Sequence, residues 1–141
     1  MTLLYIEDNP ANVEVVARFL TSRDEHARLL IATSGAEGLA AANQHRPDLI
    51  LLDLHMNDMT GEQVLRKMLA DPATANIPVA VLSADASPRV IRRLLTSGAR
   101  AYLTKPLDLG HLGELLDSYQ TSGDGAAWRF GGRSAIRKAG S

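Results

Sequence analysis

The feature that most constrains the fold is a regular alternation of short apolar runs with amphipathic stretches. The run at residues 49–52 is unbroken Leu-Ile-Leu-Leu and ends at Asp53. Short apolar runs of this kind are typical of strands buried on both faces, as in parallel sheets. Comparable runs predict further strands at residues 3–6, 27–32, 77–82 and 100–104.

The stretches between these runs predict helices, because their apolar residues recur at helical spacing. Asn9-Pro10 precedes the first helix and Ser87-Pro88 precedes the fourth, each pairing a capping residue with a proline at the first helical position. In the second helix, the positions expected to face the core are Ala36, Leu39 and Ala40.

Strand followed by helix, repeated five times, predicts an α/β fold with a parallel sheet and helices on both faces. A barrel would need eight such units and a longer chain than these 141 residues. An open, doubly wound sheet therefore fits best. We expect residues 1–120 to form this one domain. Residues 121–141 are rich in Gly, Ser and Arg and lack apolar periodicity, which predicts a flexible tail that includes Trp128.

The composition excludes several classes of protein. Fifteen basic residues balance sixteen acidic ones, so nothing global favours nucleic acid or a membrane surface as a partner. The chain has no cysteine, which excludes disulfides, thiol catalysis and thiolate metal sites. No apolar run approaches the roughly 20 residues of a membrane span, and the N-terminus lacks the basic region of a signal peptide. We expect a cytoplasmic protein.

Polar side chains stand where four of the predicted strands end: Glu7 and Asp8, Asp53, Ser83, and Lys105. The carboxyl ends of parallel strands meet at one edge of the sheet, where open α/β folds have their sites. Three carboxylates at one edge repel one another and require a cation, and hard oxygen ligands favour Mg²⁺. A lysine and a hydroxyl are suitable partners for phosphate oxygens. The set predicts phosphoryl transfer with Asp53 as the nucleophile.

Each of these residues alone has an ordinary structural explanation. Glu7 and Asp8 alone would be a solvated turn, Ser83 a loop or capping residue, and Lys105 a surface charge. Their occurrence together at the ends of successive strands of one sheet favours a functional site.

The chain resembles the receiver domain of two-component response regulators over about residues 2–120, and receivers attached to hybrid histidine kinases most of all. The segments that carry the resemblance are Leu4-Tyr5-Ile6-Glu7-Asp8-Asn9-Pro10, Leu52-Asp53-Leu54-His55-Met56 with Met59-Thr60-Gly61, Leu82-Ser83-Ala84, and Tyr102-Leu103-Thr104-Lys105-Pro106. In this order and spacing they are highly specific. The resemblance implies a flavodoxin-like, five-stranded parallel sheet with strand order 2-1-3-4-5.

By this resemblance Asp53 is a phospho-acceptor that receives its phosphoryl group from a histidine of a partner kinase or phosphotransfer protein. The domain would assist its own phosphorylation and dephosphorylation without being a classical enzyme. Mg²⁺, or Mn²⁺ in its place, would be held by Asp53, Glu7, Asp8 and the main-chain carbonyl of His55, with Glu7 binding directly or through water.

The resemblance also implies a conformational switch. Ser83 would move toward the phosphate and Tyr102 would then fill the space it leaves, while Lys105 beside a cis Pro106 would point into the site. The affected face consists of the helix at 87–97, the strand at 100–104 and the last helix at 108–119, and it would bind a downstream protein or a second copy of the chain. Its four arginines are expected to pair with acidic residues such as Asp108 or Asp117 in a dimer, without direct binding to nucleic acid. These arginines are Arg89, Arg92, Arg93 and Arg100.

Two positions depart from the usual pattern. Glu7 stands where aspartate is commoner, and its extra methylene should alter the reach to a metal. Asn57 replaces a frequent proline, so we expect a looser loop. The side chain of His55 is expected to flank the acceptor and to tune the access of water, and hence the phosphate lifetime.

Three other functions compete with this interpretation. An aspartate-nucleophile phosphatase of the haloacid dehalogenase type would need a second acid at the position of His55. A flavin-binding domain would need a Ser-, Thr- and Gly-rich loop after the first strand in place of Glu7-Asp8. An unphosphorylated scaffold, or pseudo-receiver, would be expected to lack the acceptor, an acid or the lysine. The sequence leaves open whether the domain is free-standing or belongs to a hybrid kinase.

Overall fold

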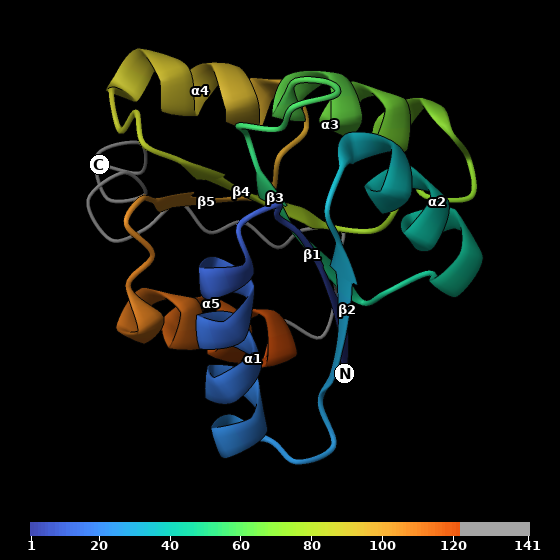
Figure 1. Cartoon of the computed structure of the whole chain (residues 1–141). Coiled ribbons are helices and arrows are strands. Elements are labelled where there is room, and N and C mark those ends of the chain that lie inside the picture. The colour runs from blue at the N-terminus through green and yellow to red at the C-terminus, as the bar shows by residue number, and fades with distance from the viewer. Residues whose placement is uncertain (122–141) are drawn as a thin grey trace.

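The computed structural model describes residues 1–121, which form a five-stranded parallel sheet with helices on both faces (Figure 1). The strands are β1 (Thr2–Ile6), β2 (Arg28–Ala32), β3 (Leu49–Asp53), β4 (Val79–Ser83) and β5 (Ala101–Thr104). Their spatial order is β2-β1-β3-β4-β5, and every neighbouring pair is parallel. The fold class and the strand order predicted from the sequence are confirmed.

In the described part of the chain, four helices connect successive strands and a fifth follows β5. They are α1 (Pro10–Arg23), α2 (Gly35–His45), α3 (Gly61–Ala70), α4 (Pro88–Thr96) and α5 (Leu109–Thr121). Figure 1 shows α1 and α5 on one face of the sheet and α2, α3 and α4 on the other. Within residues 1–121, none of these helices has both the length and the apolar character that crossing a membrane requires. Apart from Thr121, the predicted tail lies outside the described residues.

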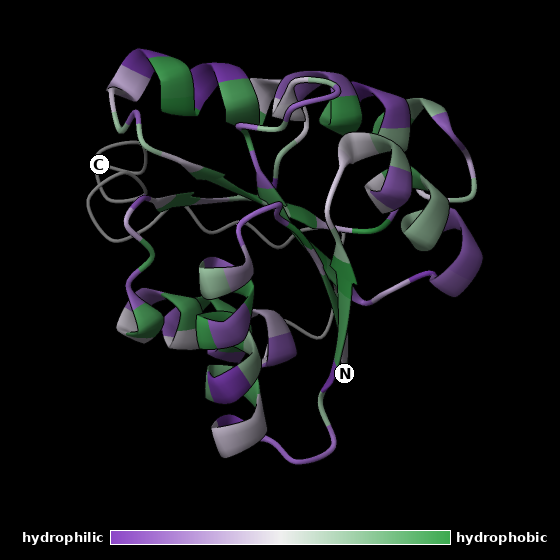
Figure 2. Cartoon of the chain, viewed as in Figure 1, coloured by the Kyte–Doolittle hydropathy of each residue, from purple (hydrophilic) through white to green (hydrophobic). Residues whose placement is uncertain are grey.

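Two apolar layers hold the sheet between its helices. Because strand side chains alternate between faces, Leu4 and Ile50 pack toward α2, α3 and α4, whereas Leu3 and Leu51 pack toward α1 and α5. Strands β3 and β4 are buried along their whole length, which explains their unbroken apolar sequences (Figure 2). The core therefore lies along the strands, and polar groups collect where the strands end.

The buried face of α2 differs from the sequence prediction. Ala36 and Ala40 are exposed and Leu39 is only partly buried. The face that packs inward contains Gly35, Gly38 and Ala42 instead. A Cβ atom on Gly38 would lie 2.4 Å from Cδ1 of Ile6, so the helix approaches β1 very closely at this glycine. Hydropathy periodicity misses such a face, because glycine adds no apolar side chain.

Candidate functional site

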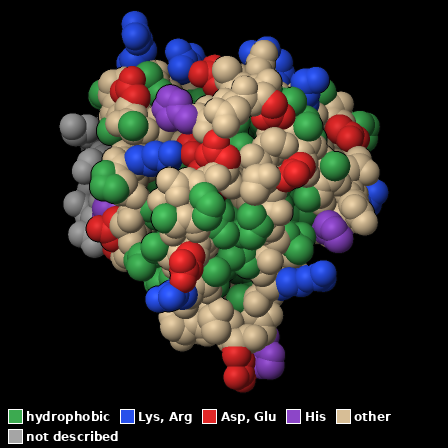
Figure 3. Space-filling view, in the orientation of Figure 1, with side chains coloured by type: hydrophobic (Ala, Val, Ile, Leu, Met, Phe, Trp, Pro, Cys, Tyr) green, Lys and Arg blue, Asp and Glu red, His purple; other side chains and the backbone are tan. Residues whose placement is uncertain are grey.

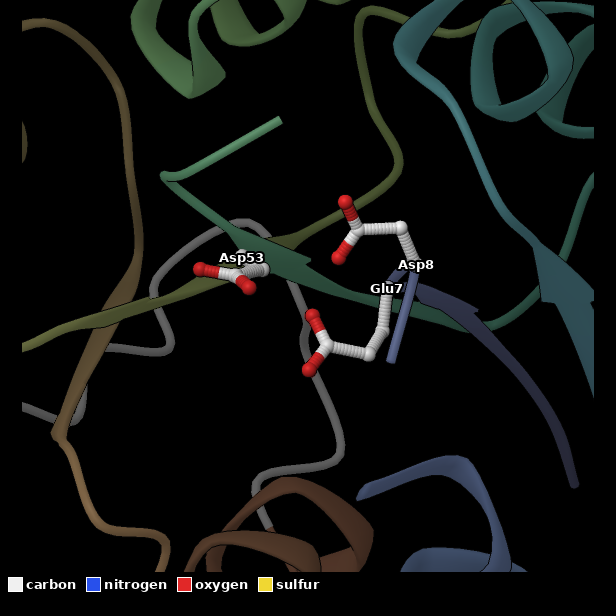
Figure 4. A group of neighbouring side chains, drawn as sticks. All are labelled: Glu7, Asp8 and Asp53. Carbon is white, nitrogen blue, oxygen red and sulfur yellow. The ribbon is translucent and has the colours of Figure 1, made fainter. Parts of the chain in front are cut away.

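Three carboxyl groups converge at the carboxyl edge of the sheet. Glu7 and Asp8 directly follow β1, and Asp53 is the last residue of β3. The parallel register pairs Ile6 with Leu52, which places the chain ends of β1 and β3 side by side. Each of the three residues offers an oxygen within 4.8 Å of the others, and Figure 4 shows the side chains facing one another. The expected convergence at this edge is therefore present.

Asp53 is almost fully buried, with 2% of its surface exposed. Its Oδ2 accepts a hydrogen bond from Nζ of Lys105 at 2.7 Å, and its Oδ1 accepts one from the main-chain N–H of His55 at 3.0 Å. Burial by itself would raise the pKa of Asp53, but the neighbouring Glu7 carboxyl, the Lys105 ammonium and the His55 amide together lower it. Asp53 is thus held as an anion that is shielded from water.

Glu7 is also buried, with 1% of its surface exposed. Its Oε1 accepts a hydrogen bond from the side-chain amide of Asn12, in the first turn of α1. Its Oε2 has no hydrogen-bond partner among the residues that the structure describes. Burial, together with the adjacent Asp53 carboxylate, raises the pKa of Glu7 to about 7. Asn12 was not predicted as a site residue, because nothing in a helix-start pattern shows that its side chain turns back toward Glu7.

The donor set suits a hard divalent cation. A buried, unpartnered carboxylate oxygen beside two further carboxylates is costly unless a positive charge satisfies it. Oxygen ligands of this kind are the ones that Mg²⁺ and Mn²⁺ prefer. The residues present therefore fit the predicted metal. The side chain of His55 is exposed and is not part of this carboxylate cluster.

The loop after β3 contacts the site through Asn57. Its side-chain amide donates a hydrogen bond to Oδ2 of Asp8 at 3.2 Å. This hydrogen bond joins the loop directly to the acidic cluster, and the looser loop expected from the sequence stays a prediction. Sequence reasoning missed this partner because the two residues are separated by 48 intervening positions of the chain and meet only across the sheet edge.

Ser83 and Tyr102 meet through the loop that follows β4. Ser83 is the last residue of β4, and its Oγ accepts a hydrogen bond from the N–H of Asp85 at 3.1 Å. The side chain of Tyr102 is fully buried, and its hydroxyl donates a hydrogen bond to the carbonyl of the same Asp85. Tyr102 thus lies inward in this structure, and its movement together with Ser83 stays a prediction.

Lys105 follows β5 and reaches back over the sheet edge to Asp53. The peptide bond between Lys105 and Pro106 is cis. The main-chain N–H of Lys105 donates to the carbonyl of Ser83 at 2.9 Å, which aligns the ends of β4 and β5. Residues from four strand ends are therefore brought together, as the sequence pattern indicated.

The arginines of α4 lie at the surface, and Figure 3 shows basic side chains along the edge formed by α3 and α4. Nη2 of Arg93 pairs with Oε1 of Glu62 on α3 at 2.7 Å. Asp117, one of the acidic residues suggested for pairing in a dimer, forms an ion pair with Arg23 of α1 in the same chain. Asp117 is thus already engaged within the chain.

Comparison with known proteins agrees with this geometry. Residues 3–117 match the family model of the response regulator receiver domain. The response regulator PleD of Caulobacter vibrioides is 39% identical over 106 residues, which cover 75% of this chain and 23% of PleD. The signal transduction histidine-protein kinase BarA of Escherichia coli is 33% identical over 120 residues, which cover 85% of this chain and 13% of BarA. The chain thus spans less than a quarter of either relative.

A solved structure is similar over most of the chain. It is the receiver domain of the sensor histidine kinase PA1611 from Pseudomonas aeruginosa, described with a magnesium ion coordinated in its active site cleft. The two chains are 27% identical with a TM-score of 0.73, and the match covers 84% of this chain and 95% of the other. Receiver regions of histidine kinases are thus among the relatives of this chain.

Proposed function

Because this chain belongs to the response regulator receiver domain family, we propose that it accepts a phosphoryl group on Asp53 from the phosphohistidine of a partner histidine kinase or phosphotransfer protein. The observation that carries this proposal is the state of Asp53. Its carboxyl group is buried, lies 2.7 Å from Nζ of Lys105 and stands at the point where Glu7 and Asp8 converge. Residues 1–120 act as one receiver unit, in the cytoplasm.

In the proposed transfer, a carboxylate oxygen of Asp53 attacks phosphorus, and the bond between phosphorus and the imidazole nitrogen breaks. The electron pair of that bond stays on the imidazole, and an acyl phosphate forms on Asp53. The Lys105 ammonium, 2.7 Å from Asp53, offsets the charge of the phosphoryl oxygens. The Ser83 hydroxyl donates a hydrogen bond to one of these oxygens. Hydrolysis of the acyl phosphate restores Asp53, and the exposed His55 side chain controls the access of water.

The carboxylates of Glu7, Asp8 and Asp53 and the main-chain carbonyl of His55 would hold Mg²⁺, or Mn²⁺ in its place. When bound, the ion neutralises the carboxylates and the phosphoryl oxygens. The unpartnered Oε2 of Glu7 and the all-oxygen donor set support this assignment. The magnesium ion described for the PA1611 receiver supports it as well.

The phosphoryl group adds about 1.5 to 2 negative charges next to Ser83. When Ser83 turns toward the phosphate, its hydroxyl no longer accepts the hydrogen bond from the Asp85 N–H and donates one to a phosphate oxygen. Asp85 is also the hydrogen-bond partner of Tyr102, so the change reaches β5 through this residue. The face formed by α4, β5 and α5 then binds a downstream protein or a second copy of the chain.

The test is incubation with a small-molecule phosphodonor and Mg²⁺, followed by intact mass measurement. We expect the wild type to gain one phosphoryl group only when Mg²⁺ is present. Asp53→Asn should gain none, and Glu25→Gln, which removes an exposed carboxylate away from the site, should behave like the wild type. A wild type without a Mg²⁺-dependent adduct would refute the proposal and favour a scaffold that is not phosphorylated. An adduct on Asp53→Asn would show that the acceptor is elsewhere.

A further inference from the structure

The loop between β3 and α3, residues 54–60, meets the acidic site at two points. The main-chain N–H of His55 donates a hydrogen bond to Oδ1 of Asp53 at 3.0 Å. The side-chain amide of Asn57 donates one to Oδ2 of Asp8 at 3.2 Å. The loop thus contacts two of the three carboxylates directly. Any displacement of the loop would move both hydrogen-bond donors relative to the site.

The carboxylate of Asp58 ties this loop to the beginning of α2. Its Oδ1 accepts a hydrogen bond from the N–H of Gly35 at 2.8 Å, and its Oδ2 accepts one from the N–H of Ala36 at 2.9 Å. These N–H groups belong to the first turn of α2, where no intrahelical acceptor exists. The two backbone hydrogen bonds lower the pKa of Asp58, and a negative charge at a helix N-terminus is favourable.

Packing around Asp58 supports the same connection. The side chain of Met59 lies against Gly35 so closely that a Cβ atom there would be 2.4 Å from Cγ of Met59. At the end of the loop, the N–H of Gly61 donates to the carbonyl of Leu54 at 3.1 Å. Helix α2 in turn packs closely against β1, where Gly38 lies against Ile6. Ile6 is the residue before Glu7. Closely packed contacts therefore run from β1 through α2 and Asp58 to the loop.

We propose that Asp58 is a positioning residue for the acidic site, which fixes the 54–60 loop against α2 and so sets how His55 and Asn57 meet Asp53 and Asp8. Asp58 acts through these residues and is not itself part of the carboxylate cluster. The part of this inference that concerns metal affinity rests on the proposed function. The part that concerns the loop rests only on the contacts described above.

The test compares Asp58→Ala with Ser34→Ala in the full chain. Ser34 is the N-cap of the same helix and accepts a hydrogen bond from the N–H of Glu37 at 3.1 Å, but its side chain makes no hydrogen bond to the loop. Both variants remove caps from α2, so a comparable loss of thermal stability is expected for both. Only Asp58→Ala removes hydrogen bonds that join the loop to α2.

Two measurements separate anchoring from helix capping. Amide hydrogen exchange of residues 54–60, without metal, should become faster in Asp58→Ala and remain at the wild-type rate in Ser34→Ala. The dissociation constant for Mn²⁺ should rise about tenfold in Asp58→Ala only, as is usual when a residue that supports metal ligands is removed. Asp58→Asn keeps one acceptor oxygen but turns an NH₂ group toward a backbone N–H, so it should lie between the wild type and Asp58→Ala.

Equal loop exchange in Asp58→Ala and Ser34→Ala would overturn the proposal, and so would equal Mn²⁺ affinities. A wild type that binds no Mn²⁺ would instead contradict the metal site of the proposed function. In that case the exchange rates alone would decide whether Asp58 positions the loop.

Discussion

The two loops on either side of the acceptor are built in different ways. The 54–60 loop is attached at three separate places, to Asp53, to Asp8 and to the N-terminus of α2. The 84–87 loop, between β4 and α4, is exposed at all four residues. Asp85 makes the two hydrogen bonds that join this loop to the strands beside it. Its N–H donates to the hydroxyl of Ser83, and its carbonyl accepts from the hydroxyl of Tyr102.

This difference matches the two tasks of the proposed site. Carboxylates that bind a metal must keep their distances, so the loop beside them is anchored at several points. A loop that transmits a conformational change must make few hydrogen bonds to its surroundings, because each additional hydrogen bond would have to break when the loop moves. We therefore expect the first loop to hold its position and the second to respond when Ser83 moves.

The largest effect is expected from Gly61→Ala, which distorts the first loop at its end. The added Cβ would lie 2.6 Å from Cα of Leu54, and a backbone atom cannot move away as cheaply as the end of a flexible side chain. We expect a loss of about 1–3 kcal/mol in the free energy of unfolding, measured by urea denaturation, together with loss of Mn²⁺ binding. Gly110→Ala is the control, because its Cβ would meet only the flexible Asp108 carboxylate, at 3.0 Å. Equal unfolding free energies for the two variants would show that the first loop tolerates displacement.

A change of pH should affect metal binding at the acidic site, which the first loop supports, and should leave the second loop unaffected. Since the pKa of Glu7 is raised to about 7, Glu7 holds its proton below that pH, and the proton competes with the metal. We expect Mg²⁺ affinity to fall up to about tenfold for each pH unit below 7, measured by calorimetry. Asp85, the titratable residue of the second loop, has a lowered pKa, set mainly by the N–H of Ser87, so it remains charged over this range. An affinity that does not change between pH 8 and 6 would contradict the raised pKa.

Tyr102→Phe should loosen the second loop and leave the first unchanged. It removes the hydroxyl that bonds the Asp85 carbonyl, and we expect a loss of about 0.5–1.5 kcal/mol in stability. Amide exchange should become faster across residues 84–87 and stay the same across 54–60. Tyr119→Phe is a matched control, because its hydroxyl bonds the carbonyl of Asp48 at 2.9 Å, away from both loops. Faster exchange in both loops of Tyr102→Phe would mean that the two loops are not independent.

The smallest effect is expected from the ion pair between α3 and α4, the helices that follow the two loops. Arg93 of α4 and Glu62 of α3 form an ion pair, with 55% and 35% of their side-chain surfaces exposed. A double-mutant cycle with Arg93→Ala and Glu62→Ala should give a coupling energy of about 0.2–1 kcal/mol, because exposed pairs contribute little. A much larger coupling would show that this pair joins α3 to α4 more strongly than an exposed ion pair should.

Prediction from the sequence succeeded where a local pattern carries the information. Short apolar runs that end in polar residues located the strands, and the ends of parallel strands must share an edge, so Glu7, Asp53 and Lys105 could be brought together without coordinates. The buried face of α2 could not be predicted in this way. Gly35 and Gly38 are buried because they permit close approach, and that depends on the neighbouring Met59 and Ile6.

The sequence by itself therefore determined the order of the elements, the parallel sheet and the groups that gather at its edge, because each follows from periodicity and from where strands end. Only the tertiary structure decided which side chains support those groups. Nothing in the sequence marks Asn12 or Asp58 as a site residue, and Asn57 stands out there only as the replacement of a frequent proline. The three reach Glu7, α2 and Asp8 only once the helices and loops have packed. The contacts of Asn57 and Asp58 depend on distances between segments far apart in the chain, and that of Asn12, five residues from Glu7, depends on how α1 is oriented after β1; no local pattern specifies either.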